Sequence, residues 1–200
     1  MRRAESSTLV QTLLPSRSVT RDVGLIGAGC ALTALAAQIQ IPWQPVPFTL
    51  QTLAVMLCGL GMGRRLGVGS QLLYLILGAG GVPVFAGASS GLDRLAGPTG
   101  GYLVSFVVMS LVLGWLSERG CTRTLLGMAS ALAVGIVLNL GLGTLWLACF
   151  IGLPAALIGG CVPFLGIEVL KASIVLPLLP AAWKVVGPPA KQDGGPGLFS

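Results

Sequence analysis

Six apolar stretches divide this sequence, and they constrain its fold more than any other feature. They span residues 23–41, 49–63, 66–80, 101–117, 125–141 and 162–183. A helix that crosses a bilayer needs about 20 predominantly apolar residues, so the second and third stretches are short for this role. Only 9% of the 200 residues are charged, whereas a soluble domain carries about 25%. The sequence therefore predicts an all-α integral membrane protein with six transmembrane helices.

The positive charges are distributed as six crossings require. If successive stretches run in opposite directions, ten cations fall on one side of the membrane and Arg94 alone falls on the other. The ten are Arg2, Arg3, Arg17, Arg21, Arg64, Arg65, Arg119, Arg123, Lys184 and Lys191. Because Lys and Arg are retained on the cytoplasmic side, both termini are expected in the cytoplasm. The net charge of +6 then follows from topology, and a basic surface for nucleic acid is not expected without a soluble domain to carry it.

One membrane domain between two polar ends is the expected organisation. Residues 1–22 are predicted to form a cytoplasmic N-terminal arm, residues 23–184 the membrane domain, and residues 185–200, rich in Gly and Pro, a flexible cytoplasmic tail. No continuous apolar segment precedes Val23, so we expect the first span to serve as its own insertion signal. The chain is expected to be a multi-pass protein of the cell membrane.

The connections on the two sides of the membrane differ in length. Those on the cation-rich side are tight, whereas residues 41–48, 81–101 and 141–161 on the opposite side are long and rich in Pro and Gly. Backbone that leaves helical geometry at membrane depth has to be satisfied by protein or water. We therefore expect these three connections to cover a cavity that opens to the outside.

The residue types that carry metal, redox or nucleotide chemistry are missing or scattered. The sequence contains no His, and its five cysteines lack CxxC spacing, so we expect no metal, no cofactor and no disulfide. None of the three lysines follows a Gly, which excludes a Walker A motif. Energy for transport would then come from another polypeptide or from a gradient.

Glu168 and Lys171 lie one helical turn apart inside the last apolar stretch. An ionisable residue at membrane depth costs about 2.5–3.5 kcal/mol, so its presence indicates a functional site. Side by side, a carboxylate and an ammonium can satisfy a neutral ligand that has both N–H and C=O groups. The alternative is an internal ion pair that only holds helices together. Because a dry ion pair is a poor stabiliser, we favour the ligand.

The outer segment 81–102 is the second region where we expect ligand contacts. Its Gly and Pro residues leave the backbone as the main polar surface, to which a hydroxyl and an amphipathic ring are added. Arg94 is the one cation of this side, and its guanidinium suits a carboxylate; Asp93 and a lipid phosphate are alternative partners. The other candidate contacts are Gly97, Thr99, Gly100, Gly101 and Tyr102.

A Val-Pro pattern followed by Phe recurs on the outer side and ends at Phe48, Phe85 and Phe164. We expect each Pro to begin or end a helix there and each Phe to turn toward a shared apolar pocket. Chance recurrence, together with interfacial anchoring of aromatic rings, explains the pattern equally well.

The first apolar stretch carries small residues one helical turn apart, among them Gly24, Gly27, Ala28 and Ala31. Such small-xxx-small spacing lets another transmembrane helix approach closely. This small-residue ridge indicates either docking of a partner protein or packing within the same bundle.

Several longer motifs are similar to those of one transporter family. They are VPFTLQTL at 46–53, YLILG at 74–78, GVPVFAG at 81–87, GPTGGY at 97–102 and PFLGIEVLKA at 163–172. In these motifs the chain resembles the BioY family, the biotin-binding S components of energy-coupling factor transporters. The resemblance implies six helices, an outward-facing biotin site near the ends of spans four to six, and partnership with a transmembrane coupling subunit and two ATPase subunits.

The resemblance also implies roles for individual residues. Glu168 and Lys171 are expected near the ureido ring of biotin, Arg94 near its carboxylate, and the small-residue ridge against the coupling subunit. The family usually has Asp where this chain has Glu168, which is one methylene longer. The contact with the ureido ring is therefore expected to shift.

The residues predict a component that binds and transports a solute, and the resemblance implies that it captures biotin outside the cell and delivers it across the membrane with ATP-hydrolysing partners. Two alternatives stay open. One is a self-sufficient, proton-coupled carrier of a small carboxylate solute, with Glu168 as the proton relay. The other is an intramembrane enzyme with Glu168 as acid or base and Lys171 as its partner, although a convincing nucleophile is missing.

Overall fold

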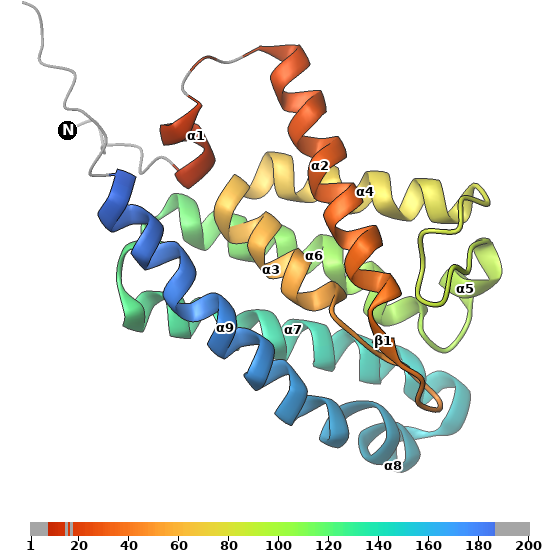
Figure 1. The fold of residues 1–200 in the computed structure, drawn as a ribbon. Coiled ribbons are helices and arrows are strands. Elements are labelled where there is room, and N and C mark those ends of the chain that lie inside the picture. Colours follow the sequence, from red (N-terminus) through yellow and green to blue (C-terminus); the bar gives the residue numbers. More distant parts are fainter. Residues whose placement is uncertain (1–7, 15, 17, 187–200) are drawn as a thin grey trace, which may run out of the picture.

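The computed structural model describes residues 8–14, 16 and 18–186, which are predominantly helical (Figure 1). The α-helices of this part of the chain are α1 (Leu9–Leu13), α2 (Val19–Gln38), α3 (Gln51–Met62), α4 (Arg64–Ala79), α5 (Leu92–Ala96), α6 (Gly100–Glu118), α7 (Leu125–Ile151), α8 (Leu153–Ala156) and α9 (Val162–Val186). A 3-10 turn, Cys121–Arg123, precedes α7, and a π-helical turn, Leu157–Cys161, joins α8 to α9. Between α2 and α3, the two-residue strands β1 (Gln40–Ile41) and β2 (Phe48–Thr49) pair antiparallel as a hairpin.

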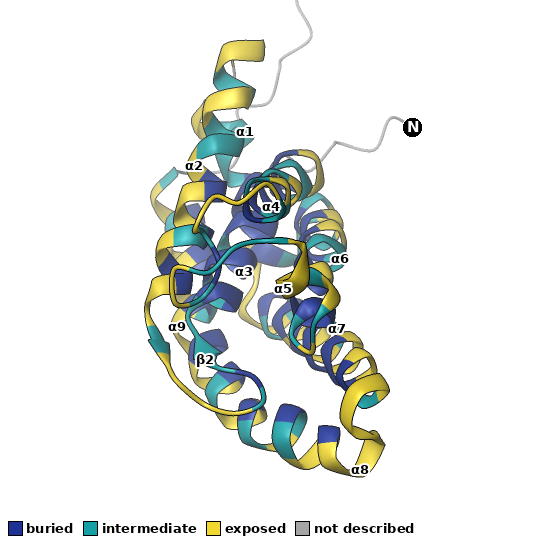
Figure 2. Ribbon diagram, turned by 90° about the vertical axis from the view of Figure 1, so that its right-hand side faces the viewer, coloured by how far each residue is buried: buried dark blue, intermediate teal, exposed yellow. Residues whose placement is uncertain are grey.

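Helix α3 forms the centre of the bundle. Ten of its 12 residues are buried, and it contacts α2, α4, α6 and α9. Figure 2 shows α3 as a largely buried helix surrounded by helices whose outer faces are exposed. Those outer faces carry large aliphatic side chains such as Leu35, Val137 and Val169. Lipid tails are as apolar as Leu, so this surface suits a bilayer.

The connections between the helices gather at two ends of the bundle (Figure 1). One end holds α1, the α3–α4 and α6–α7 connections and the last turn of α9; the other holds the hairpin, α5 and α8. At the first end Arg64 pairs with Glu118 at 3.2 Å, and Arg123 lies over the ring of Trp183 at 5.1 Å. Arg94 belongs to the second end. Arg64 and Arg123 therefore lie at the opposite end of the bundle from Arg94, as the charge pattern requires. The side of the membrane that each end faces stays a prediction.

Four helical segments are long and apolar enough to cross a membrane: α2, α6, α7 and the continuous stretch 153–186. Helices α3 and α4 are shorter, with 12 and 16 residues. Each of the six predicted stretches coincides with one of α2, α3, α4, α6, α7 and α9, and the two short stretches with the two short helices. The prediction of an all-helical membrane protein is confirmed; the count of six crossings stays a prediction.

The region 141–161 differs from the sequence-based expectation. It was expected to be a long irregular connection, but α7 continues to Ile151 and the residues after Gly152 are also helical. Two of its glycines serve close packing inside the bundle, since a Cβ at Gly143 would collide with the ring of Tyr102 and one at Gly160 with its hydroxyl. Only Gly152, with φ of +80°, interrupts the helical path.

The two predicted polar ends are described only in part. Helix α2 begins at Val19, four residues before the expected start of the membrane domain, and the arm contains α1, which packs against α3 and α9. Residues 1–7 and 187–200 lie outside the described residues, and with them most of the predicted tail.

Candidate ligand-binding site

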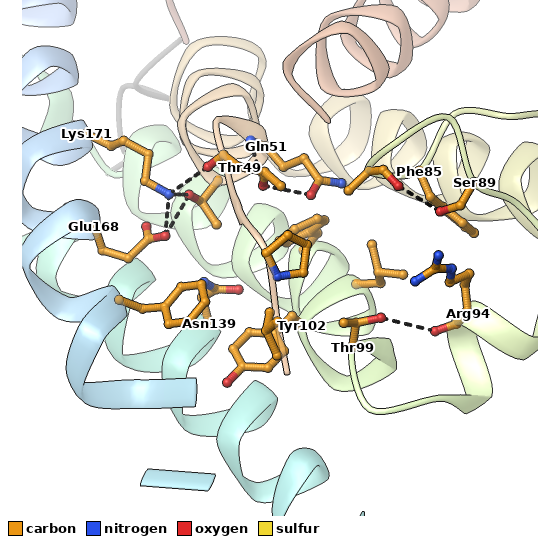
Figure 3. A pocket seen from close by; sticks show the side chains of 17 residues that line it. Thr49, Gln51, Phe85, Ser89, Arg94, Thr99, Tyr102, Asn139, Glu168 and Lys171 are labelled. Atoms are coloured by element: carbon orange, nitrogen blue, oxygen red, sulfur yellow. Dashed lines mark hydrogen bonds and ion pairs between the residues drawn. The ribbon is translucent and has the colours of Figure 1, made fainter. Parts of the chain in front are cut away.

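A cavity lies between the hairpin, the segment that carries α5, and helices α3, α6, α7 and α9 (Figure 3). It contains about 640 Å³ of space free of protein atoms, part of it open to solvent. Glu168 and Lys171 lie at one end of it and Arg94 at the other. The cavity therefore has an ion pair at its inner end, a cation at its outer end and a mainly apolar region between them.

The two charges of the last helix are brought together as predicted. Glu168 and Lys171 form an ion pair on α9, and only 2% and 4% of these residues is exposed. The Lys171 ammonium donates to the Glu168 Oε1, to the Thr52 hydroxyl and, at 3.1 Å, to the backbone carbonyl of Thr49. An ammonium has three protons, so all of them are used within the protein.

The carboxylate of Glu168 is satisfied on one oxygen only. Its Oε1 accepts from Lys171 and, at 2.9 Å, from the hydroxyl of Thr52. Its Oε2 is buried and has no hydrogen-bond partner among the described residues. A buried charged oxygen without a donor is costly, which favours a ligand that supplies one. The inner end of the cavity therefore offers an acceptor and is suited to an N–H or O–H group.

The hairpin and the first turn of α3 supply the remaining polar groups of this end. The Thr49 hydroxyl donates to the Gln51 side-chain oxygen at 2.8 Å, and the Gln51 amide donates to the Tyr74 hydroxyl at 2.6 Å. Tyr74 donates in turn to the backbone carbonyl of Val84 at 3.2 Å. These bonds fix the hairpin and the segment after α4 in one arrangement around the ion pair.

Aromatic rings form the middle of the cavity. Phe164 lines it, with its ring centroid 4.3 Å from that of Phe48 and 6.2 Å from that of Tyr102. The Tyr102 hydroxyl donates to the carbonyl of Gly160 at 2.8 Å, which ties α6 to the π-helical turn before α9. Phe85 lines the cavity from the segment before α5. Of the three Phe residues of the Val-Pro pattern, two therefore line the cavity, and Phe48 packs against Phe164 without lining it.

Phe85 is held firmly against the bundle. Its ring contacts Tyr74 edge-on, with centroids 5.4 Å apart, and it occupies the space that a Cβ at Gly78 would need. Its backbone carbonyl accepts from the side-chain NH₂ group of Gln38 at 3.2 Å. The side-chain oxygen of Gln38 accepts in turn from the backbone N–H of Ala88. The outer wall of the cavity is thus fixed to both α2 and α4.

Arg94 lies on α5 at the outer end of the cavity. Among the described residues it has no ion pair, so the expected alternative partner Asp93 does not hold its guanidinium. Thr99 also lines the cavity here, and its hydroxyl is 3.5 Å from the backbone carbonyl of Arg94. Beyond Arg94, a wider hollow lined by the tip of the hairpin, including Trp43, continues toward the surface.

Three glycines of the GPTGGY motif do not line this cavity. A Cβ at Gly100 would collide with the carbonyl of Leu95, and one at Gly101 would collide with the side chain of Trp146. The carbonyl of Gly97 accepts from the Trp146 indole N–H at 2.9 Å. In the structure these glycines let α5, α6 and α7 pack closely, and their contact with a ligand stays a prediction.

The small-residue ridge of α2 faces away from the bundle. Gly24, Ala28 and Ala31 are exposed, and Gly27 is partly exposed. None of the described residues lies within 4 Å of a Cβ built at Gly24 or Gly27. Packing within the described bundle therefore does not account for this ridge.

Sequence reasoning missed several polar residues that line the cavity, namely Thr49, Gln51, Thr52, Ser89 and Asn139. Asn139 is the one that the sequence could have indicated. It is an amide in the middle of a long apolar helix, and a polar group at membrane depth needs a partner.

Comparisons with known proteins agree on one family. The chain matches the BioY family over residues 5–188. It is 40% identical over 153 residues to a Pyrococcus horikoshii protein named "Probable biotin transporter BioY", which covers 76% of this chain and 90% of the relative. It is also 40% identical over 153 residues to "Biotin transporter BioY2" of Lactococcus lactis subsp. cremoris, which covers 76% of this chain and 84% of the relative.

A third relative and one solved structure extend these matches. The chain is 37% identical over 149 residues to "Biotin transporter BioY" of Thermotoga maritima, with 74% of this chain and 88% of the relative covered. The crystal structure of an S-component for biotin from an ECF-type ABC transporter has the same fold, with a TM-score of 0.71. That match has 23% sequence identity and covers 84% of this chain and 95% of the other.

Proposed function

This chain belongs to the BioY family, and we propose that it is the biotin-binding S component of an uptake transporter in the cell membrane. It captures biotin from outside and delivers it across the membrane with ATP-hydrolysing partner subunits. The observation that carries this proposal is the order of groups along the cavity: a carboxylate oxygen of Glu168, then a wall of aromatic rings, then the cation Arg94. Within the part of the chain that the structure describes, that oxygen has no hydrogen-bond partner and Arg94 has no ion pair.

Biotin presents matching groups in the same order. Its ureido ring has N–H donors, its middle is apolar, and its valeryl chain ends in a carboxylate. We place the ureido ring at Glu168, the sulfur-containing ring and chain against Phe164 and its neighbours, and the carboxylate at Arg94. A guanidinium can bind a carboxylate through two parallel hydrogen bonds. With the polar head innermost, the ligand enters from the side that carries α5 and the hairpin tip.

Glu168 in place of the family's usual Asp changes the reach of the carboxylate by one methylene. In this chain the extra length is used to bring Oε1 to both Thr52 and Lys171. We propose that the second oxygen accepts a ureido N–H and that biotin sits correspondingly farther from the backbone of α9.

The proposed topology has six crossings with both termini in the cytoplasm. Arg64, Arg123 and Lys184 lie at one end of the bundle and Arg94 at the other, which supports this orientation through the positive-inside rule. Residues 1–22 would then form a cytoplasmic arm and residues 185–200 a cytoplasmic tail. The outer end of the cavity would face the cell exterior.

The proposed partners are a transmembrane coupling subunit and two ABC-type ATPase subunits. The chain has no Walker A motif, so ATP hydrolysis has to occur on other polypeptides. The exposed ridge of Gly24, Gly27, Ala28 and Ala31 is suited to close approach by a helix of the coupling subunit. We propose this ridge as the docking face.

The two alternatives are less well supported. An intramembrane enzyme disagrees with relatives that are named as transporters. A self-sufficient proton-coupled carrier would need Glu168 to exchange protons, and uptake would persist without ATPase partners and collapse with the proton gradient. We expect the opposite result in proteoliposomes: uptake that requires the ATPase subunits and survives an uncoupler.

Calorimetry of the detergent-purified protein with biotin tests the proposal. We expect tight binding by the parent and a large loss of affinity in Glu168→Gln and Lys171→Met, because each leaves a buried polar group of the inner end without its partner. Lys184→Met, the same substitution in the last turn of the same helix, serves as the control and should bind as the parent does. A parent that does not bind biotin would refute the function; unchanged affinity in both site variants would refute the site.

A further inference from the structure

Asn139 is an uncharged polar residue of the cavity that lies outside every motif named in the sequence analysis. It lies on α7, lines the cavity and is only 2% exposed. Behind it, on α6, the hydroxyl of Ser105 is fully buried and does not line the cavity. The two side chains are in contact, so Ser105 determines how the Asn139 amide is turned.

Counting protons decides the orientation of this amide. The Ser105 Oγ is 2.7 Å from the backbone carbonyl of Tyr102 and 2.8 Å from the Asn139 side-chain atom assigned as oxygen. A hydroxyl has one proton and cannot donate to both. The Tyr102 carbonyl can only accept, whereas an amide turned by 180° exchanges its acceptor for a donor.

In only one arrangement are both short contacts of the Ser105 hydroxyl hydrogen bonds. Ser105 donates to the Tyr102 carbonyl and accepts from the NH₂ group of Asn139. The NH₂ group of Asn139 then faces Ser105, and its side-chain carbonyl oxygen faces the cavity. In the opposite orientation the single proton of Ser105 would serve only one of its two oxygen neighbours, at 2.7 and 2.8 Å. The other pair of oxygens would then be in contact with no proton between them, which is repulsive in a buried site.

We propose that Asn139, oriented by Ser105, offers its carbonyl oxygen to an N–H group of the ligand. Together with the Oε2 of Glu168, which has no partner among the residues the structure describes, the cavity then presents two acceptors from two different helices. All three protons of Lys171 are used within the protein. The inner end therefore selects a head group with two N–H donors, which is the chemistry of a cyclic urea. This inference rests on the proposed function, and Ser105 is its positioning residue.

Calorimetry with biotin and its two mono-N-methylated ureido derivatives tests this assignment. Asn139→Leu keeps nearly the same size and removes the amide, and we expect about three- to tenfold weaker binding of biotin, the worth of one neutral hydrogen bond. The derivative methylated at the nitrogen that faces Asn139 has no N–H group at that position, so it cannot form this hydrogen bond even with the parent protein. Its affinity should change by less than about twofold on Asn139→Leu, while the other derivative should weaken as biotin does.

Ser105→Ala should show the same dependence on the methylated position with a smaller loss, because it removes only the group that orients the amide. Ser110→Ala, the same change on the same helix at a buried residue that does not line the cavity, should alter no affinity. If Asn139→Leu does not fold, as judged by gel filtration and thermal unfolding, the affinities of Ser105→Ala and Ser110→Ala for the three ligands decide whether the inference holds.

The possible results separate the role of Asn139 from the proposed function. Equal weakening of all three ligands would show that Asn139 does not accept an N–H, and an unchanged affinity for biotin would show that it does not contact the ligand; either result overturns the inference alone. A parent that binds none of the three ligands overturns the proposed function and the inference with it.

Discussion

The hydroxyl of Thr52 on α3 donates a 2.9 Å hydrogen bond to Glu168 on α9 and accepts one from Lys171. Helix α3 is the most buried helix of the bundle, and α9 carries the ion pair. One uncharged side chain therefore joins both charges of the site to the centre of the fold. The position of the ion pair depends on α3 as much as on its own helix.

Replacing Thr52 with Val keeps the shape of the side chain and removes its hydroxyl. Lys171 then lacks one acceptor and Glu168 lacks one donor. Hydrogen bonds to charged groups contribute about 1.5–3 kcal/mol, so we expect about ten- to hundredfold weaker binding of biotin in calorimetry. Thr52→Ser keeps the hydroxyl and should stay within about threefold of the parent. Binding by Thr52→Val at the parent's affinity would contradict the role given to this hydroxyl.

Arg94→Gln should weaken binding of biotin and spare its neutral amide. Biotinamide has the same ureido ring and chain but no carboxylate for the guanidinium to bind. Loss of a charge-assisted contact corresponds to about ten- to hundredfold for biotin, and we expect less than about threefold for biotinamide. Arg94→Lys keeps the charge but not the planar fork, and should lie between the parent and Arg94→Gln.

The comparison of the two ligands separates two roles for Arg94. A loss confined to biotin identifies contact with the carboxylate. An equal loss for biotin and biotinamide would instead show that Arg94 only supports the wall of the cavity.

The positions of the helices were largely predictable because apolar stretches and clustered cations carry a strong signal. The ionisable residues Glu168, Lys171 and Arg94 were found for the same reason, since charge is rare in this chain and conspicuous wherever it occurs. The structure places all three on one cavity. Their contact with a ligand stays a prediction.

The uncharged half of the site could not be read from the sequence. Thr52 is a functional neighbour of Glu168 only because α3 and α9 pack together, and nothing in its local sequence indicates that contact. The glycines led to a wrong prediction of secondary structure. In segment 141–161 they were taken as breaks in a loop, but in a helical bundle a residue such as Gly143 provides room for a neighbouring ring.

Gly78→Ala should lower both stability and affinity for biotin. The Phe85 ring occupies the space that the new methyl group would need, so either the ring or α4 has to move. Overpacking of this kind costs about 1–3 kcal/mol, which we expect to appear as a lower midpoint of thermal unfolding. Displacement of Phe85 from the cavity wall should also weaken biotin binding.

Gly166→Ala is the matched control for this change. Gly166 lies in α9, and no described residue comes within 4 Å of a Cβ built there, so Ala should fit without loss of stability. In addition, Phe85→Leu in the Gly78→Ala background should restore part of the lost stability by making room for the methyl group. Unfolding of Gly78→Ala at the parent's temperature would show that the ring is not tightly held.

Ala28→Trp tests whether the small-residue ridge of α2 docks a partner. Ala28 is exposed beside Gly24 and Gly27, and a Trp there would prevent a second helix from approaching closely while leaving the interior of the bundle untouched. We therefore expect unchanged binding of biotin by the detergent-purified chain. Uptake of radiolabelled biotin should fall severalfold in cells that also produce the coupling and ATPase subunits.

Val137→Trp is the control for this substitution, because Val137 is 69% exposed on α7 and belongs to no small-residue ridge. A Trp there would meet lipid, and uptake should equal that of the parent. Normal uptake by Ala28→Trp would move the docking face elsewhere on the bundle. An equal loss in both variants would point instead to a general effect of a bulky ring on membrane insertion. Only a loss confined to Ala28→Trp, with biotin binding intact, separates capture of the ligand from coupling to the energy-supplying subunits.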